Sequence, residues 1–155
     1  MTIYFLRHAD AENMAPSDFE RNLTPKGLEQ AAKVGRYCKA HGLAPDRILT
    51  SPLNRARQTA EIVAKALGAE PVVQDWLACG MRLETLLKEL TAQGKVESLL
   101  VVGHEPDFSS VISELIGASE GYGVLVTKAS LTAVDLPWME AGSGQLQFSI
   151  PVRLM

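Results

Sequence analysis

Short runs of β-forming apolar residues alternate with amphipathic helical stretches through most of this chain, and that alternation constrains the fold most strongly. The runs from Ile3 to Leu6 and from Ser98 to Val102 have the character of buried strands. A shorter strand is predicted from Arg47 to Thr50, and a weak one at Val72-Val73. Strands and helices that alternate over such short distances predict a mainly parallel sheet covered by helices on both faces, a three-layer α/β sandwich.

Four helical stretches are predicted between and after these strands. The first begins at Thr24-Pro25, which pairs a good N-cap with proline at the first helical position, and it ends at Gly42. The second is predicted from the same signal at Ser51-Pro52, and it ends at Gly68. The other two stretches run from Leu83 to Leu90 and from Phe108 to Ile116.

The character of the sequence changes beyond Gly123. The segments from Ala129 to Leu136 and from Gln145 to Val152 are predicted to be two strands joined by a glycine-containing turn, and so an antiparallel edge of the sheet. No internal repeat, low-complexity tract or linker interrupts the 155 residues. We therefore predict a single domain over residues 1–155.

Charge and composition narrow the class of partner. A net charge of -3, a pI of about 5.6 and the lack of a basic run argue against nucleic acid or an anionic membrane as the main partner. The first apolar run is too short for a secretory signal, and no stretch approaches the ~20 apolar residues that span a bilayer. Cys38 and Cys79 lack metal-ligand spacing and need not pair. These observations predict a cytoplasmic protein.

Two arginines and two histidines stand where the predicted strands end. Arg7 and His8 directly follow the first strand, Arg55 lies in the first turn of the helix after the second strand, and His104 directly follows the strand that starts at Ser98. Ligands of open α/β sheets bind at the carboxyl ends of the strands. We therefore expect these four residues at one edge of the sheet, the edge formed by the carboxyl ends of the parallel strands. Arginine forks bind phosphoryl oxygens, a neutral imidazole can attack phosphorus, and a second, protonated imidazole can donate to the developing charge.

Each of these residues has a plainer interpretation when it is taken alone. His104 could cap its own helix, and Arg55 could pair with Glu61 on the surface of its helix. The coincidence of three such segments favours a site. His41 lies beside Gly42 at a helix end, where a cation suits the helix dipole, and it is given no catalytic role.

The spacing of His8, Asp10 and Glu12 also raises the question of a metal site. These residues follow the end of the predicted strand, so their alternation does not place them on one face. No second cluster of ligand residues accompanies them. We therefore predict no metal.

Three motifs stand at these strand ends. They are the strand-Arg7-His8 opening, Ser51-Pro52-Leu53-x-Arg55-Ala56-x-Gln58-Thr59, and Val102-Gly103-His104-x-Pro106. Together they resemble the motifs of the histidine phosphatase superfamily. Their order and spacing match over residues 5 to 106, although Ala9 stands where the family usually has glycine. The short chain leaves little room for a lid between Asp75 and Val96. Together with Arg21-Asn22-Leu23-Thr24-Pro25-x-Gly27, this layout resembles the compact SixA-type phosphohistidine phosphatases.

The resemblance implies a role for each matched residue. His8 would attack phosphorus and become transiently phosphorylated, Arg7 and Arg55 would clamp the phosphoryl oxygens, and His104 would stabilise the transition state. Water would then release phosphate, without a metal or cofactor. Arg21 is a further expected contact of the substrate. The implied partner is a phosphorylated histidine-containing protein, and phosphate or a phosphate analogue is the expected ligand of the site.

No carboxylate is marked by its position as the general acid. The candidates are Asp10, Glu12, Asp18 and Glu84. A phosphate ester expels an alkoxide and gains much from an acid, whereas phosphohistidine expels an imidazole that is easier to protonate. A missing acid therefore favours a phosphoramidate substrate.

Two other functions stay open. One is a small-molecule phosphomonoesterase or phosphomutase of the same superfamily, and the other is a module that binds phosphoryl groups without hydrolysing them. Binding alone would not require a nucleophile such as His8, which argues against the module.

Overall fold

The computed structural model describes residues 1–118 and 123–155. The strands are β1 (Thr2–Arg7), β2 (Arg47–Thr50), β3 (Pro71–Val73), β4 (Ser98–Gly103), β5 (Leu131–Asp135) and β6 (Gln145–Ile150). The helices are α1 (Pro25–Ala40), α2 (Asn54–Leu67), α3 (Leu83–Ala92) and α4 (Asp107–Leu115), with short 3-10 turns at Asp75–Leu77 and Val152–Leu154. No helix of these two ranges is long and apolar enough to cross a bilayer.

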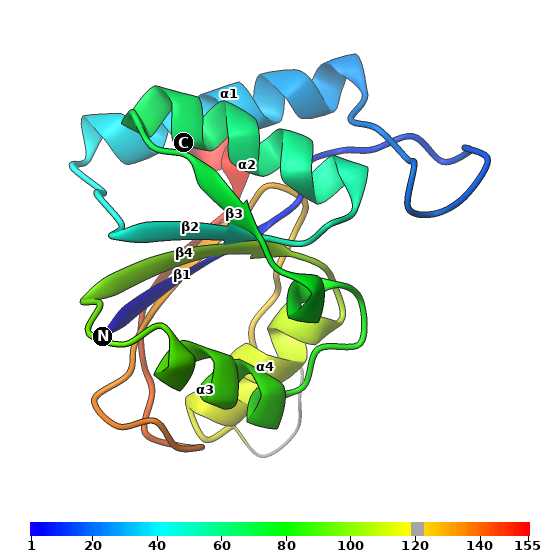
Figure 1. Cartoon of the computed structure of the whole chain (residues 1–155). Coiled ribbons are helices and arrows are strands. Elements are labelled where there is room, and N and C mark those ends of the chain that lie inside the picture. Colours follow the sequence, from blue (N-terminus) through cyan, green and yellow to red (C-terminus); the bar gives the residue numbers. More distant parts are fainter. Residues whose placement is uncertain (119–122) are drawn as a thin grey trace.

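The strands form one sheet in the order β3-β2-β4-β1-β5-β6 (Figure 1). Neighbours among β1, β2, β3 and β4 run parallel, whereas β5 is antiparallel to β1 and β6 is antiparallel to β5. Helices α1 and α2 cover one face, and α3 and α4 cover the other (Figure 1). The predicted three-layer α/β architecture with an antiparallel C-terminal edge is therefore confirmed.

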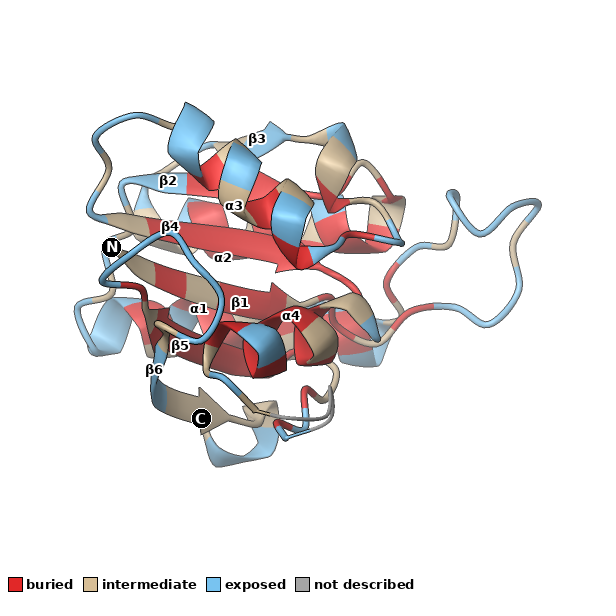
Figure 2. Cartoon of the chain, turned by 90° about the horizontal axis from the view of Figure 1, so that it is seen from below, coloured by how far each residue is buried: buried red, intermediate tan, exposed pale blue. Residues whose placement is uncertain are grey.

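Strands β1 and β4 lie at the centre and are buried on both faces (Figure 2). Ile3 and Phe5 of β1 pack into the core beneath α3 and α4, whereas Leu6 packs into the core beneath α1 and α2. The alternation of side chains along a strand makes one apolar run serve both cores. The carboxyl ends of these strands are consequently held on a rigid support.

The predicted start of α2 is wrong. The helix begins at Asn54, and its N-cap is Leu53, whose side chain makes no capping hydrogen bond. Ser51 lies before the helix, where its hydroxyl accepts a hydrogen bond from the Leu53 amide at 3.3 Å. Gly68 ends the helix as predicted, in a left-handed conformation with φ of 70° that glycine adopts without strain.

The two C-terminal strands are shorter than predicted. β5 begins at Leu131 rather than Ala129, because Ala129 has a positive φ of 56°, which strand geometry does not allow. β6 ends at Ile150, since Pro151 has no amide hydrogen to extend the ladder. The antiparallel pairing itself is confirmed.

The segment between β1 and α1 projects from the edge where the parallel strands end (Figures 1 and 2). Most of residues 12–20 are exposed. The base of this projecting loop is tightly packed, because a Cβ atom at Gly27 would collide with the carbonyl oxygen of Asp10. Thr24 caps α1 by accepting a hydrogen bond from the Gly27 amide at 3.0 Å, as the sequence predicts.

Candidate active site

The parallel register brings the ends of β1, β2 and β4 together. Arg7 pairs with Gly103, and Thr50 pairs with Val102, so the residues that follow are neighbours across the sheet edge. The amide of His8 donates to the carbonyl oxygen of Gly103 at 3.0 Å, which continues the ladder by one residue. The expectation that segments far apart in sequence meet at this edge is confirmed.

His8 is buried and held in one tautomer. Its Nδ1 atom lies 2.7 Å from the carbonyl oxygen of Ala9, which can only accept, so Nδ1 carries the proton. Its Nε2 atom accepts a hydrogen bond of 3.3 Å from Nε of Arg55. Burial lowers the pKa of His8 to about 4, so the ring is neutral at pH 7. The Nε2 lone pair, which accepts the hydrogen bond from Arg55, is consequently the nucleophilic position of the imidazole.

His104 lies beside His8, with ring centroids 5.3 Å apart. Its Nε2 atom is 2.7 Å from the hydroxyl oxygen of Ser51, and its buried Nδ1 atom has no partner among the described residues. Burial, followed by the charges of its neighbours, lowers the pKa of His104 to about 3.

The expectation that the second histidine is already protonated is therefore not met. A neutral ring can still donate, because a hydroxyl proton from Ser51 on Nε2 leaves the ring proton of His104 on Nδ1. An arriving phosphoryl dianion would raise the pKa of this ring.

Arg55 is 4% exposed and reaches from the first turn of α2 to both the histidine pair and the projecting loop. Its Nη1 and Nη2 atoms donate to the carbonyl and carboxylate oxygens of Asp18 at 2.7 and 3.0 Å. The alternative pairing with Glu61 is wrong: Glu61 lies 3.8 Å from Arg57 instead. Asp18 therefore occupies donors of the Arg55 guanidinium that a phosphoryl group would use.

Arg7 leaves the end of β1 and donates from Nη1 to the carbonyl oxygen of Val126 at 2.9 Å. Its Nε atom is buried and has no partner in the described part of the chain. Burial lowers the pKa of Arg7, but guanidinium groups stay charged at neutral pH. This arginine thus brings positive charge and an unused donor to the sheet edge that His8 shares.

The four candidate acids lie in different surroundings. Asp10 accepts from Lys128 at 2.7 Å and from the Thr24 hydroxyl at 2.7 Å, and these bonds lower its pKa. Hydrogen bonds, first from Arg21 and then from Arg55, lower the pKa of Asp18. Both carboxyl groups are therefore ionised at neutral pH, which does not suit a proton donor.

Glu12 and Glu84 lie outside this arrangement. Glu12 accepts from the Asn22 amide at 3.2 Å within the projecting loop. Glu84 is exposed in the first turn of α3 and makes no hydrogen bond or ion pair with the described residues. Arg21, the further expected contact of the substrate, is engaged by Asp18 at 2.9 Å and by the carbonyl oxygen of Glu12.

Three contacts of the site were not assigned from the sequence. Ser51 holds His104, and the Thr59 hydroxyl accepts from the Ala9 amide at 3.1 Å while it donates to the Arg55 carbonyl at 2.7 Å. Sγ of Cys79 lies 4.0 Å from Nη2 of Arg55, and burial raises the pKa of this thiol. Ser51 and Thr59 both stand inside the motif around Arg55, which was the available signal.

This arrangement can bind a tetrahedral anion and attack it. Cations and unused donors surround a neutral imidazole whose lone pair is held at a fixed position. Among the residues that the structure describes, no cluster of three or more His, Cys, Asp or Glu side chains could hold a metal ion. His41 lies away from this group, and its ring stacks on Tyr37 at 4.1 Å.

Known proteins share both the sequence pattern and the fold. Residues 3–78 match the family model of the histidine phosphatase superfamily (branch 1). The chain is 35% identical over 129 residues to the phosphohistidine phosphatase SixA homolog of Haemophilus influenzae, covering 76% of this chain and 78% of that protein. It is 29% identical over 155 residues to phosphohistidine phosphatase SixA of Escherichia coli, covering 97% and 93%.

A solved structure agrees with these sequence relatives. The protein histidine phosphatase SixA complexed with tungstate superimposes with a TM-score of 0.88 at 27% identity, and the match covers 99% of both chains. The motifs around His8, Arg55 and His104 thus occur in a chain whose whole length follows one family. The chain belongs to the histidine phosphatase superfamily, is of the SixA type, and is a hydrolase.

Proposed function

We propose that this phosphatase hydrolyses phosphohistidine on a phosphotransfer or signalling protein through a phosphorylated His8 intermediate. One observation carries the proposal: His8 is a buried neutral imidazole whose Nδ1 proton is bound by Ala9 and whose Nε2 lone pair faces a guanidinium. A phosphoryl group that binds Arg55 would displace the hydrogen bond from this guanidinium to Nε2 and lie next to the lone pair, which is the proximity that in-line attack needs.

The reaction would proceed in two displacements. In the first, Nε2 of His8 forms a bond to phosphorus while the bond from phosphorus to the substrate imidazole breaks, and that imidazole takes a proton from water. In the second, water attacks phosphorus, the bond to Nε2 breaks, and phosphate leaves with His8 neutral again. Arg7 and Arg55 would bind the phosphoryl oxygens, and Nδ1 of His104 would donate to the charge that develops.

The ionised state of the nearby carboxylates supports a phosphoramidate as substrate. Asp10 and Asp18 are held as carboxylates by cations, so neither brings a proton to a departing group. An alkoxide would leave slowly from such a site, whereas an imidazole is readily protonated by solvent. The names of the two relatives, each called a phosphohistidine phosphatase or a homolog of one, point to the same substrate class.

We propose that residues 1–155 act as one domain, since the sheet edge draws its site residues from the first and the second half of the chain. The mechanism has no step that needs a metal or cofactor. We also propose that the reaction takes place in the cytoplasm, where the free thiols of Cys38 and Cys79 would stay reduced.

The test compares phosphate release from a phosphohistidine protein and from p-nitrophenyl phosphate, with wild-type protein and His8→Ala in EDTA. We expect fast, His8-dependent release from the phosphohistidine protein and slow release from the ester. Comparable turnover of both would favour a phosphomonoesterase. No release from either substrate by folded protein would leave a phosphoryl-binding module.

A further inference from the structure

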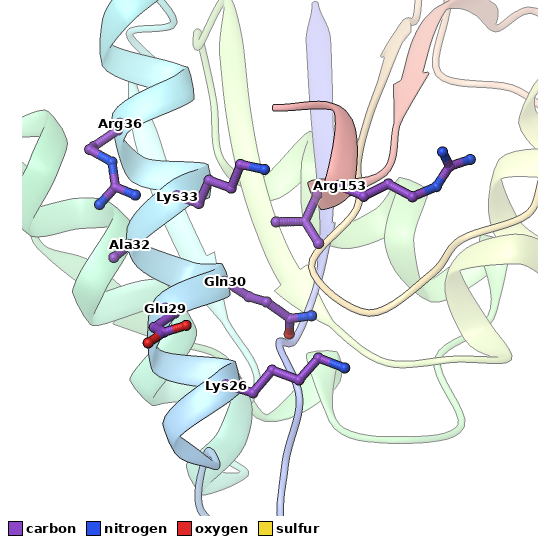
Figure 3. A pocket seen from close by; sticks show the side chains of 8 residues that line it. Lys26, Glu29, Gln30, Ala32, Lys33, Arg36 and Arg153 are labelled. Carbon is purple, nitrogen blue, oxygen red and sulfur yellow. The ribbon is translucent and has the colours of Figure 1, made fainter.

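A groove runs along one face of α1 toward the sheet edge. Its first part, a hollow of about 480 Å³, lies between α1 and the C-terminal turn (Figure 3). A second hollow of about 710 Å³ continues from it and shares the walls formed by Lys26, Gln30, Val152 and Arg153. We refer to the two hollows together as the basic groove. Its charged lining residues are Lys26, Lys33, Arg36, Lys128 and Arg153, with Glu29 and Asp10.

The charge of the groove is opposite to that of the whole chain. Lys26, Lys33 and Arg153 form no ion pair with any described residue, nor does Arg36. Lys128 is paired with Asp10, so Glu29 is the one lining carboxylate outside an ion pair within residues 1–118 and 123–155. Four unpaired cations thus gather on a protein whose net charge is -3. Such a patch attracts an acidic surface and orients it.

The spacing of the cations gives the groove a direction. Lys26, Gln30 and Lys33 recur at steps of four and three, so they stand on one face of α1. Figure 3 shows these three side chains extending from α1 toward the C-terminal turn that carries Arg153. A row of donors along a helix suits an extended acidic segment rather than a single anion.

The wall of the groove is bonded to the backbone of the strand end that carries the proposed nucleophile. Thr127 and Lys128 line its second part, and the carbonyl oxygen of Val126, next to them, accepts from Arg7 at the end of β1. The amide of Ala129 donates to the carbonyl oxygens of Arg7 and His8 at 3.1 and 3.2 Å. A protein that places a phosphohistidine at His8 would therefore lay its neighbouring surface over this groove.

We propose that the basic groove docks the acidic surface around the phosphohistidine of a protein substrate. The inference rests on the proposed function and names its partner by charge. Apolar side chains favour a protein over a nucleic acid, because Leu125, which is 82% exposed, lines the groove with Pro151 and Val152. None of the residues lining the two hollows is aromatic, so bases would find no side chain on which to stack.

The experiment uses two phosphohistidine peptides of equal length, one flanked by glutamates and the other by glutamines, with free phosphohistidine as a third substrate. The enzyme variants are wild type, Lys33→Glu with Arg153→Glu, and the matched control Lys88→Glu with Lys95→Glu. Lys88 lies in α3 and Lys95 follows that helix, on the side of the sheet opposite α1. Each double variant replaces two cations by two carboxylates, so both change the net charge by the same amount. A Lys33→Gln, Arg153→Gln variant separates loss of attraction from new repulsion.

Wild type should show about tenfold higher kcat/KM for the acidic peptide at low salt, and this preference should shrink as salt is raised. The groove variants should lose the preference but keep the rate with free phosphohistidine, and the control variant should keep both. Equal kcat/KM for the two peptides in wild type, or a preference that survives in the groove variants, would overturn the proposal that the basic groove docks an acidic surface. Either result would leave the proposed reaction intact.

Binding to His8→Ala protein tests the groove independently of turnover. This variant should bind the glutamate peptide about tenfold tighter than the glutamine peptide. If wild type hydrolyses none of the substrates but this binding preference holds, the proposed function is wrong and the basic groove still binds an acidic surface. Equal competition by an oligonucleotide of the same net charge would reassign the groove to nucleic acid and overturn the proposal.

Discussion

The sheet edge and the projecting loop bring charge to the same place by different means. At the edge, His8, Arg55 and His104 are 7%, 4% and 2% exposed, and sheet ladders or a helix start hold their backbones. In the loop, Asp18 reaches Arg55 with a side chain that is 60% exposed. Burial thus fixes the reactive groups, whereas the countercharge on Arg55 comes from a segment that solvent surrounds.

This difference in exposure indicates which contacts within the site a bound substrate replaces. A phosphoryl group that binds Arg55 can displace the Asp18 carboxylate at little cost, because an exposed carboxylate is readily solvated. It also replaces the Arg55 bond to Nε2 of His8. It cannot displace the bond from Nδ1 of His8 to Ala9, or the bond between Ser51 and His104, without disturbing buried groups. Variants at the edge should therefore have large effects, and variants in the loop should have small ones.

Loss of the Arg55 guanidinium should have the largest effect. Arg55→Ala is expected to lower kcat by about 10² to 10³, since one preorganised donor to the transition state is worth that much. The measurement is steady-state release of phosphate from a phosphohistidine protein. Arg57→Ala is the matched control, because Arg57 is an exposed arginine two residues further along α2 that pairs with Glu61. A similar rate for both variants would contradict the role of the edge.

Acid should weaken the folded state through the two buried histidines. The pKa values of His8 and His104 are lowered to about 4 and about 3, against about 6.5 in an unfolded chain. The unfolded state therefore binds more protons below pH 6.5. The free energy of unfolding therefore keeps its full value above pH 6.5. It decreases as pH falls toward 4, by up to about 1.4 kcal/mol per pH unit for each histidine.

Urea denaturation between pH 7 and pH 4 measures this slope. Replacing His104 by glutamine should remove one histidine's share of the slope. His41→Gln is the control, since His41 is an exposed residue at the end of α1. A slope that His104→Gln leaves unchanged would show that this ring is not held neutral by the fold.

Loss of the Ser51 hydroxyl should have an intermediate effect. Ser51→Ala removes the bond to Nε2 of His104 and is expected to lower kcat about tenfold, the equivalent of one hydrogen bond of about 1.4 kcal/mol. KM should change little, and the acid limb of the pH profile should shift because the tautomer of His104 is no longer fixed. Ser113→Ala, a buried serine in α4, controls for general destabilisation. Full activity in Ser51→Ala would mean that His104 is oriented by other contacts.

The loop substitution Asp18→Asn should have the smallest effect. Loss of the carboxylate frees Arg55 for a second anion, so inhibition by inorganic phosphate should strengthen about threefold. Turnover of phosphohistidine should stay within about threefold of wild type. Glu20→Gln, in the same loop, is the control. A collapse of turnover in Asp18→Asn would instead identify Asp18 as a required acid.

The buried, periodic segments of the chain are the parts that the sequence could predict. Runs such as Ile3–Leu6 and Ser98–Val102 are buried on both faces and therefore carry a strong strand signal. If these strands are parallel, the topology alone places His8, Arg55 and His104 at one edge. Residues that meet across a β ladder are predictable, because the backbone hydrogen bonds repeat at regular steps along the paired strands.

The contacts of the loop and of Ser51 were not predictable in the same way. Asp18 pairs with Arg55 across 37 residues, and no periodic pattern encodes that approach. Ser51 matched a helix-capping signal, but its hydroxyl is bonded to His104, and α2 begins three residues later. A residue type that favours a local cap can serve a distant partner equally well, and only the three-dimensional structure separates the two.

The most direct test of the account is to trap the phosphorylated enzyme. Wild-type protein is mixed with a phosphohistidine protein in EDTA, quenched in alkali within milliseconds, digested and analysed by mass spectrometry for the labelled residue and ring nitrogen. We predict phosphate on Nε2 of His8, because Nδ1 is bound to the Ala9 carbonyl oxygen. Phosphate on another residue or on Nδ1, or rapid turnover that persists in His8→Ala, would contradict the account.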